Sequence, residues 1–210
     1  MNQAIRIESF GGPDELRLAE TAAVTPGPGE VHIRQTHIGV NYIDVYFRTG
    51  LYRPAQMPFT PGLEAAGEVL AVGDGVDTLT PGQRVAYVGG PPGAYARERV
   101  ISADRVVALP AAITSERAAA MMLKGMTAHM LLERVHAVGP GDRVLIHAAA
   151  GGVGLLLCQW AHHLGATVIG TVGSAEKAEQ ARAHGCHHPV LYRDESVSER
   201  VQALTGGEGV

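Results

Sequence analysis

The chain has 210 residues, a formal net charge of -4 and an isoelectric point near 6.2. Hydrophobic residues make up 46% and charged residues 18% of it, which supplies a packed core and excludes a disordered chain. The acidic balance and the lack of a polybasic stretch argue against nucleic acid and anionic lipid as partners.

The sequence offers no targeting or membrane signal. Its first residues run into a strand-like pattern rather than a basic segment followed by an apolar core. The richest apolar run, Val153 to Leu164, is too short and too interrupted to span a bilayer. Two cysteines, Cys158 and Cys186, are typical of a reducing compartment. We therefore expect a cytoplasmic protein.

As far as Pro110, short runs of β-branched residues alternate with turns rich in Gly and Pro, such as Pro26 to Gly29. This alternation predicts an all-β region with irregular loops. The predicted strands are Ala4–Glu8, Val31–Ile38, Gly67–Val72, Arg84–Val88 and Val106–Leu109.

A single helix is predicted next, from Ser115 to Leu132, with Gly125 as the place where it could be interrupted. The sequence pattern changes after Pro110, and the domain boundary is expected between Ala120 and Gly141. We place the domains at residues 1–125 and 126–210.

The second half alternates strands with helices, which predicts right-handed βαβ units on a parallel sheet. The strands are expected at Arg143–His147, Thr167–Val172 and Pro189–Tyr192, and the helices at Val153–Leu164, Ser174–His184 and Glu195–Leu204. Three strands form only one half of a doubly wound dinucleotide-binding sheet. We therefore expect a longer chain whose sheet continues after Val210.

A glycine-rich loop, Ala148 to Gly154, follows the first of these strands and opens a helix. Small residues allow the backbone to approach a pyrophosphate, whose charge meets the free N–H groups of the helix N-terminus. Gly151, Gly152 and Val153 are the expected contacts. The loop departs from the G-x-G-x-x-G spacing, so a tight turn without a ligand is the alternative.

The end of the next strand distinguishes between cofactors. An NAD site usually has Asp or Glu about 20 residues after the loop, to hold the ribose 2′-hydroxyl. Here Gly173 and Ser174 stand at that strand end, and Lys177 follows. Ser174 and Lys177 can donate to a 2′-phosphate, with Tyr192 nearby, which favours NADPH. Alternatively, Ser174 is only a helix cap and Lys177 a solvated surface residue.

Four stretches together resemble the quinone oxidoreductases, the zeta-crystallin branch of the medium-chain dehydrogenase/reductase superfamily. They are Gly39–Tyr52, Pro61–Gly67, Lys124–Thr127 and Ala148–Gly154. The resemblance covers the whole sequence. It implies an α/β protein overall, with a GroES-like all-β catalytic domain followed by a truncated Rossmann domain with its doubly wound parallel sheet.

The resemblance also implies site residues, a quinone substrate and a homodimer formed through an edge of the Rossmann sheet. The segment expected to line the nicotinamide comprises Asn41, Tyr42, Ile43, Asp44, Val45 and Tyr46. Arg48 and Tyr52 are expected near the quinone. Further cofactor contacts are expected at Thr127, Met130, Gly152, Val153, Gly173, Ser174, Lys177 and Tyr192. Met130 departs from the pattern, because some close relatives have Tyr there.

Zinc is not expected. Alcohol dehydrogenases of the same superfamily have a zinc-binding Cys at the position of Asn41 and a cysteine-rich lobe after Val88, and this sequence has neither. A quinone accepts a hydride without a Lewis acid, so the missing ligands favour a quinone as the acceptor. The run from His184 to His188 resembles a ligand cluster, but we expect it in a surface loop where the side chains need not converge.

The expected reaction is hydride transfer from NADPH, bound between the two domains, to a quinone lying against Tyr46, Arg48 and Tyr52. Arg48 would stabilise the developing phenolate, and Asn41 would orient the nicotinamide carboxamide or the quinone oxygen. Asn41 and Asp44 could instead only cap a helix. The remaining alternatives are an enoyl reductase on the same scaffold and a non-catalytic NADPH-binding protein.

Overall fold

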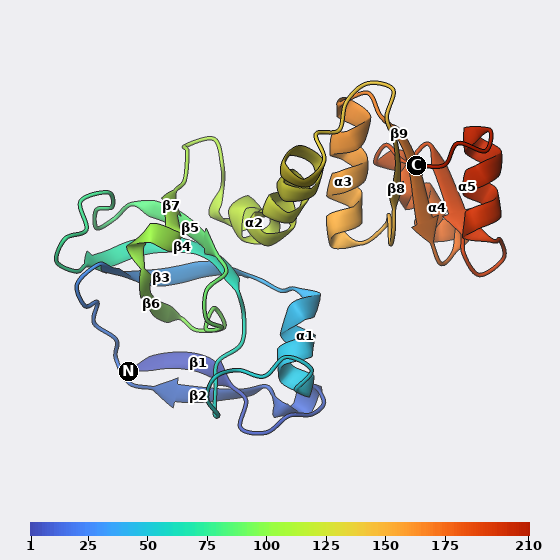
Figure 1. The fold of residues 1–210 in the computed structure, drawn as a ribbon. Helices are drawn as coiled ribbons and strands as arrows, with labels where there is room; N and C mark the ends of the chain where they lie inside the picture. The colour runs from blue at the N-terminus through green and yellow to red at the C-terminus, as the bar shows by residue number, and fades with distance from the viewer. The chain divides into compact units, whose positions relative to one another are not determined.

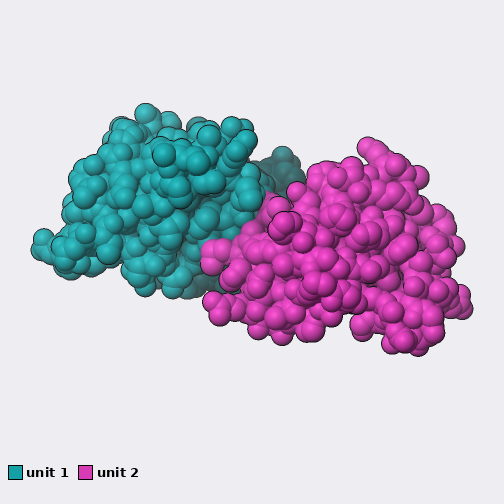
Figure 2. Space-filling view, turned by 90° about the horizontal axis from the view of Figure 1, so that it is seen from above, with its two compact units in different colours: residues 1–123 teal, residues 124–210 magenta.

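A computed structural model describes all 210 residues. The chain forms two compact units, Met1–Leu123 and Lys124–Val210 (Figure 2). Their elements are labelled in Figure 1, and each unit is described by itself. The boundary between them falls within one helix, α2 (Ser115–His129).

Unit 1 is built on a five-stranded antiparallel sheet with the order β6-β3-β4-β5-β7. Its strands are β3 (Glu30–Gly39), β4 (Glu64–Val72), β5 (Arg84–Val88), β6 (Glu98–Ser102) and β7 (Val106–Ala108). Alternate side chains on one face form its largest core, which includes Val31, Ile33, Val69, Val85 and Tyr87. On the other face, Ala118 and Ala119 of α2 pack against the small residues Ala66 and Ala86.

A second, two-stranded sheet pairs β1 (Asn2–Arg6) with β2 (Arg17–Thr21), and Figure 1 shows it in a layer of its own. The other edge of β1 meets the segment before β6, where the Ile5 N–H donates to the Tyr95 carbonyl at 2.8 Å. Short 3-10 turns lie at Pro13–Glu15 (η1) and Ala103–Arg105 (η2).

Several strands of unit 1 differ from the sequence prediction. The first strand lies two residues earlier than predicted, and the strands β2 and β6 were missed. Both missed strands are at sheet edges and carry charged residues, and neither has more than two apolar residues in a row. The prediction did recognise the central strands, although β4 begins three residues before the predicted Gly67.

The helix predicted from Ser115 had Gly125 as the place where it could be interrupted, and no interruption lies there. The helix α2 passes through Gly125 unbroken and ends at His129, where a π-type segment, Met130–Val135 (η3), follows. One glycine inside a helix costs only about 1 kcal/mol relative to alanine, and its neighbours here are good helix formers. The irregularity therefore lies a turn later than predicted.

Unit 2 is a three-stranded parallel sheet with the order β10-β9-β8. It comprises β8 (Arg143–Ile146), α3 (Gly152–His163), β9 (Thr167–Val172), α4 (Ala175–Ala183), β10 (His188–Leu191) and α5 (Val197–Thr205). Val168 and Val172 face the core shared with α3 and α4, whereas Ile169 faces Val201 of α5. Helices thus cover both faces of β9, and the predicted alternation of strands and helices is confirmed.

Both predicted ends of β9 are correct, and the other predicted element ends in unit 2 lie within two residues of the observed ones, as is usual for element ends. No helix in either unit is both long enough and apolar enough to cross a lipid bilayer.

Candidate functional site

The glycine-rich loop of unit 2 is held against β9 by its backbone. Ala148 has φ 51°, a left-handed conformation that non-glycine residues rarely adopt. The Ala148 N–H donates to the Thr171 hydroxyl at 3.2 Å, and the Ala149 N–H donates to the Thr171 carbonyl at 3.0 Å. The Gly151 N–H closes the turn onto the Ala148 carbonyl at 2.7 Å. Thr171, which the sequence did not single out, therefore fixes the loop.

The loop opens directly into the N-terminus of α3, and it requires glycine there. A Cβ on Gly154 would lie 2.2 Å from the Ala148 carbonyl oxygen and 2.8 Å from Ala149 Cα, so the helix could not pack this closely against the loop. No side chain caps the helix at Gly151. The first N–H groups of α3, including those of Gly152 and Val153, therefore lack helical partners and suit an anion.

At the end of β9, Ser174 is the N-cap of α4 and its hydroxyl oxygen accepts from the Lys177 backbone N–H at 3.3 Å. This use of the oxygen leaves the hydroxyl proton available for donation. The Lys177 side chain is exposed. A Cβ on Gly173 would lie 2.7 Å from the Tyr192 hydroxyl oxygen, which places that hydroxyl over the strand end. The four predicted residues Gly173, Ser174, Lys177 and Tyr192 are thus brought together.

The predicted contacts Thr127 and Met130 lie at the end of α2 and the start of η3. Thr127 is half-buried, and the Met130 side chain is 49% exposed. One turn before Thr127, the Lys124 side chain covers the glycine loop: a Cβ on Gly152 would lie 2.9 Å from Lys124 Cε. Sequence reasoning quoted Lys124 in a motif but assigned it no role. A lysine beside an open helix N-terminus adds a positive charge where a phosphate would bind.

In unit 1, the predicted pair Asn41 and Asp44 begins the helix α1 (Tyr42–Thr49) as a capping box. The Asn41 backbone N–H donates to Asp44 Oδ2 at 2.9 Å, and the Tyr95 hydroxyl donates to the same oxygen at 2.9 Å. Both members of the pair are buried, and Asp44 Oδ1 has no hydrogen-bond partner.

Burial alters the pKa of Asp44 and of its hydrogen-bond partner Tyr95. Burial raises the pKa of Asp44 above 3.8, and the hydrogen bonds from Asn41 and Tyr95 only partly oppose this. Burial, together with the Asp44 charge, also raises the pKa of Tyr95. Tyr95 therefore remains a hydrogen-bond donor to Asp44 at neutral pH.

Glu64, at the start of β4, is a fully buried carboxylate beside this helix start. Its Oε1 accepts from Asn41 Nδ2 at 2.6 Å, and its Oε2 accepts from the Leu123 backbone N–H at 2.7 Å. The sequence analysis quoted Glu64 within Pro61–Gly67 without assigning a function to it. The available signal was a single charge in a stretch that is otherwise small or apolar.

The predicted aromatic residues gather along α1 and the turn after it. The ring centroids of Tyr42 and Tyr46 lie 5.3 Å apart, as do those of Tyr46 and Tyr52, both in edge-to-face geometry. Tyr42 and Tyr52 are exposed, while Ile43, Val45 and Tyr46 are half-buried. The structure thus brings Tyr42, Tyr46 and Tyr52 into one partly exposed aromatic surface.

Arg48 is attached to a neighbouring loop. One guanidinium N–H donates to the Gly11 carbonyl at 2.8 Å, and the Gly11 N–H donates back to the Arg48 carbonyl at 3.0 Å. A guanidinium carries further N–H donors, so this contact leaves some of them for a second acceptor.

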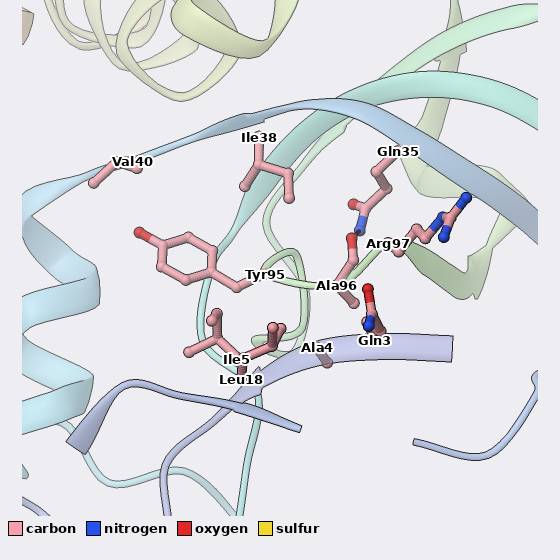
Figure 3. A pocket seen from close by; sticks show the side chains of 10 residues that line it. All are labelled: Gln3, Ala4, Ile5, Leu18, Gln35, Ile38, Val40, Tyr95, Ala96 and Arg97. Atoms are coloured by element: carbon pink, nitrogen blue, oxygen red, sulfur yellow. Dashed lines mark hydrogen bonds between the residues drawn. The ribbon is translucent and has the colours of Figure 1, made fainter. Parts of the chain in front are cut away.

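A cavity of about 460 Å³ adjoins this region in unit 1 (Figure 3). The Tyr95 ring lines it together with Ile38 and Val40, while Ile5 and Leu18 face them from β1 and β2. Its lining is mostly apolar. The residues expected to hold a quinone, Tyr46, Arg48 and Tyr52, do not line this cavity.

The histidine-rich segment before β10 does not form a metal centre. The Val168 N–H donates to His187 Nδ1 at 2.9 Å, so the ring proton lies on Nε2, which faces His162 Nδ1 at 3.1 Å. Neither nitrogen of His187 then offers a lone pair to a metal. No group of three His, Cys, Asp or Glu side chains in the chain could hold an ion.

Cys158 and Cys186 are buried free thiols in the core of unit 2. The contact with Cys186, together with burial, raises the pKa of the Cys158 thiol, so Cys158 stays protonated and packs as a small apolar side chain.

Two family models match the chain. Residues 27–111 match the alcohol dehydrogenase GroES-like domain, and residues 152–210 match the zinc-binding dehydrogenase family. The first lies in unit 1 and the second in unit 2. The predicted fold class is confirmed: an α/β protein with a GroES-like domain and a Rossmann-like domain.

Relatives resemble the chain over its whole length. A quinone oxidoreductase of Pseudomonas aeruginosa is 46% identical over 99% of the chain and 64% of its own length, and a 2-haloacrylate reductase of a Burkholderia species is 47% identical over 100% and 65%. The structure of Escherichia coli quinone oxidoreductase complexed with NADPH superimposes with a TM-score of 0.96 at 44% identity, covering 98% of the chain and 63% of that protein.

The chain therefore spans a little under two thirds of the length of these relatives. Both units carry the family's domains in the family's order, and the predicted resemblance is confirmed. The chain thus carries an alcohol dehydrogenase GroES-like domain and a zinc-binding dehydrogenase domain, and over its length it is similar to the quinone oxidoreductases of the medium-chain dehydrogenase/reductase superfamily.

Proposed function

We propose that the protein is an NADPH-dependent reductase that transfers a hydride to a quinone. The observation that carries this proposal is the end of β9, where Ser174 and Lys177 present donors and the strand end has no carboxylate. The relative of known structure complexed with NADPH supports the choice of cofactor, and the relatives named quinone oxidoreductase support the choice of acceptor.

The residues of unit 2 fit the phosphates of NADPH. The open N–H groups of Gly152 and Val153 would hold the pyrophosphate, with Gly151 forming the turn and Lys124 adding positive charge. The Ser174 hydroxyl, the Lys177 ammonium and the Tyr192 hydroxyl would donate to the 2′-phosphate. Charge-assisted hydrogen bonds of this kind each contribute about 1.5–3 kcal/mol. Thr127 and Met130 are proposed as further cofactor contacts.

The residues of unit 1 suit the reacting end. We assign the segment Asn41–Tyr46 to the nicotinamide, where the fixed amide of Asn41 and the fixed carboxyl group of Asp44 orient the ring and exclude water. The bound nicotinamide supplies the hydride. The half-buried ring of Tyr46 and the exposed ring of Tyr52 offer a stacking surface to a planar acceptor, and the remaining donors of Arg48 can stabilise a developing phenolate.

A second candidate reaction is reduction of an activated C=C bond. It is favoured by the Burkholderia relative at 47% identity, which is named 2-haloacrylate reductase. Both reactions deliver a hydride to a π system conjugated with a carbonyl group, so negative charge develops on an oxygen, and the same donors can stabilise an enolate or a phenolate.

Steady-state kinetics of the whole protein test both candidates. We expect 1,4-benzoquinone to be reduced with NADPH at a kcat/KM about 100-fold above that with NADH, the difference that one or two lost charge-assisted hydrogen bonds produce. Equal kcat/KM values for the two cofactors would contradict the assignment of Ser174 and Lys177. A kcat/KM for 2-chloroacrylate above that for every quinone tried would replace the first candidate by the second.

We also propose a cytoplasmic enzyme that forms a homodimer and binds no nucleic acid. The free buried thiols support a reducing compartment, and the net charge of -4 argues against a nucleic-acid partner. The dimer rests on the family resemblance. Light scattering after size exclusion, with the whole protein, measures the oligomeric state directly.

A further inference from the structure

The buried carboxylate of Glu64 has a position that the proposed reaction does not yet explain. We infer that Glu64 is a positioning residue for Asn41: it fixes which end of the Asn41 amide faces β4 and which faces helix α1. The inference rests on the proposed function, because it assigns Glu64 a role at the residue that orients the nicotinamide.

The backbone of unit 1 makes room for this carboxylate. Gly39 of β3 lies opposite Glu64 of β4 in the sheet register. A Cβ on Gly39 would lie 2.3 Å from Glu64 Cγ, from Glu64 Oε1 and from the Ala119 carbonyl oxygen of α2. Any residue larger than glycine would therefore displace either the carboxylate or the helix. The space between β3 and α2 is shaped for the Glu64 side chain.

The chemistry of the carboxylate decides the orientation of the amide. The Asn41 atom at 2.6 Å from Oε1 is the amide nitrogen, which donates to the Glu64 side chain. The amide oxygen is then the end turned away from Glu64, and the Asp44 N–H of the first turn of α1 donates to the Asn41 backbone carbonyl at 3.0 Å. Without an acceptor at position 64, the amide can rotate by half a turn and exchange its oxygen and nitrogen.

The second oxygen of Glu64 ties this arrangement to helix α2. Oε2 accepts from the backbone N–H of Leu123, the last residue of unit 1. A glutamine at position 64 has nearly the same shape and can still accept from Leu123 through its amide oxygen. Its other end, however, is an NH₂ group that would face the Asn41 NH₂ group. The substitution Glu64→Gln therefore preserves packing and the helix contact while removing the constraint on Asn41.

The test is a double-mutant cycle in the whole protein, with Glu64→Gln, Asn41→Ala and the two combined, assayed with NADPH and 1,4-benzoquinone. We expect Glu64→Gln to lower kcat about 10- to 100-fold, the effect of a small misplacement of a reacting group. The KM for NADPH should change by less than about threefold, because the charged phosphates bind to other residues. The kinetic isotope effect with 4-deuterated NADPH should rise as hydride transfer becomes slower than product release.

The cycle separates positioning from structure. If Glu64 acts through Asn41, the double variant has the kcat of Asn41→Ala within about twofold. Independent effects that multiply would overturn the inference, as would a kcat for Glu64→Gln equal to that of the wild type. A fall in kcat accompanied by an equal loss of NADPH affinity and of melting temperature would show a merely structural residue, and would overturn it as well.

The matched control is Glu68→Gln, four residues further along the same strand, where the carboxylate is exposed and pairs with Arg34 at 3.0 Å. It should leave kcat, KM and the isotope effect unchanged. A wild-type protein that binds NADPH but reduces neither quinones nor 2-haloacrylates would refute the proposed function itself. A wild type that is active, with Glu64→Gln indistinguishable from it, would refute only the role of Glu64.

Discussion

Each unit has its own candidate site region, the start of α1 in unit 1 and the glycine loop in unit 2, and the two are built in opposite ways. At the start of α1, buried carboxyl groups of Asp44 and Glu64 hold the backbone and the amide of Asn41. At the glycine loop, backbone contacts with Thr171 hold the chain and the first N–H groups of α3 stay open.

This difference matches what each region would bind. A phosphate brings its own negative charge and needs open donors, so a loop without carboxylates suits it. A neutral carboxamide brings no charge, and its orientation depends on fixed donors and acceptors. Buried carboxylates are costly, and they provide that fixed direction only because each accepts hydrogen bonds from well-placed donors.

The largest effect is expected from placing a side chain at Gly154, where the glycine loop meets α3. In Gly154→Val, the added side chain meets the backbone of Ala148 and Ala149, which cannot move without displacing the loop from Thr171. We expect a loss of about 2–4 kcal/mol in the free energy of unfolding, together with loss of measurable NADPH binding. Urea denaturation and fluorescence titration with NADPH measure the two effects.

Gly139→Ala is the control for this variant, because a Cβ there meets nothing within 4 Å and the backbone does not have positive φ. It should bind NADPH like the wild type. Normal NADPH binding by Gly154→Val would show that the loop is not the phosphate site.

A second, smaller effect should follow from placing a carboxylate at the open end of β9. In Ser174→Asp, the new side chain can still cap α4 by accepting from the Lys177 N–H, but it repels a 2′-phosphate. We expect NADPH affinity to fall about 100-fold while NADH affinity stays the same or rises. Isothermal titration calorimetry with both cofactors measures this.

Ser196→Asp repeats the same change at the N-cap of α5, where Ser196 accepts from the Glu199 N–H at 3.4 Å. It should leave the affinities for both cofactors unchanged. An equal loss of NADPH affinity in the two variants would point to a nonspecific effect of charge and contradict the assignment.

The start of α1 should make the stability of the protein depend on pH, because burial raises the pKa of Asp44 above 3.8. The native state then keeps this proton over a pH range where the unfolded chain has lost it. The Asp44 contribution to stability is therefore full below pH 3.8 and declines as the pH rises through the raised native pKa. One proton corresponds to at most about 1.4 kcal/mol per pH unit.

The asparagine in Asp44→Asn does not titrate. Urea unfolding of the wild type and the variant from about pH 3.5 upward, where carboxyl groups titrate, therefore isolates the contribution of Asp44 to the free energy of unfolding. The stability of the wild type minus that of the variant should fall with rising pH and then level off. A difference that rises with pH would mean that the native structure favours the ionised carboxylate.

The smallest effect is expected at His187, which belongs to neither candidate site region. Burial, and then the neighbouring His162 and His188, lower its pKa below 6.5. Its contribution to stability is thus present above pH 6.5 and is lost as the pH falls through the lowered native pKa. Because His187 is exposed, solvent screening keeps the change small.

In His187→Asn, the amide oxygen can replace Nδ1 as the acceptor for the Val168 N–H without titrating. Thermal denaturation between about pH 5 and 7.5, around the ordinary histidine pKa, should show a smaller acid-induced loss for this variant than for the wild type. Parallel losses in the two proteins would contradict the assigned tautomer.

The sequence predicted the glycine loop well because its determinants are local. Gly151, Gly152 and Gly154 lie within one turn that joins a strand to a helix, and Ser174 stands at the end of the next strand. The same holds for the capping box of Asn41 and Asp44, which are three residues apart.

The partners of that capping box could not be read from the sequence. Glu64 reaches Asn41 through the register of β3 with β4, and Leu123 of α2 in turn donates to Glu64. Tyr95 reaches Asp44 from the segment before β6. The edge strands β2 and β6 were missed for a related reason, since pairing rather than residue type makes them strands. The role of Thr171 depends in the same way on the parallel pairing of β8 with β9.

The most direct test of the account is a crystal structure of the whole protein with NADPH. The account predicts the pyrophosphate on the N–H groups of Gly152 and Val153, and the 2′-phosphate on Ser174 and Lys177. It also predicts the nicotinamide beside Asn41, with Nδ2 of that residue still donating to Glu64. Phosphates bound away from the glycine loop, or an Asn41 amide that no longer contacts Glu64, would contradict it.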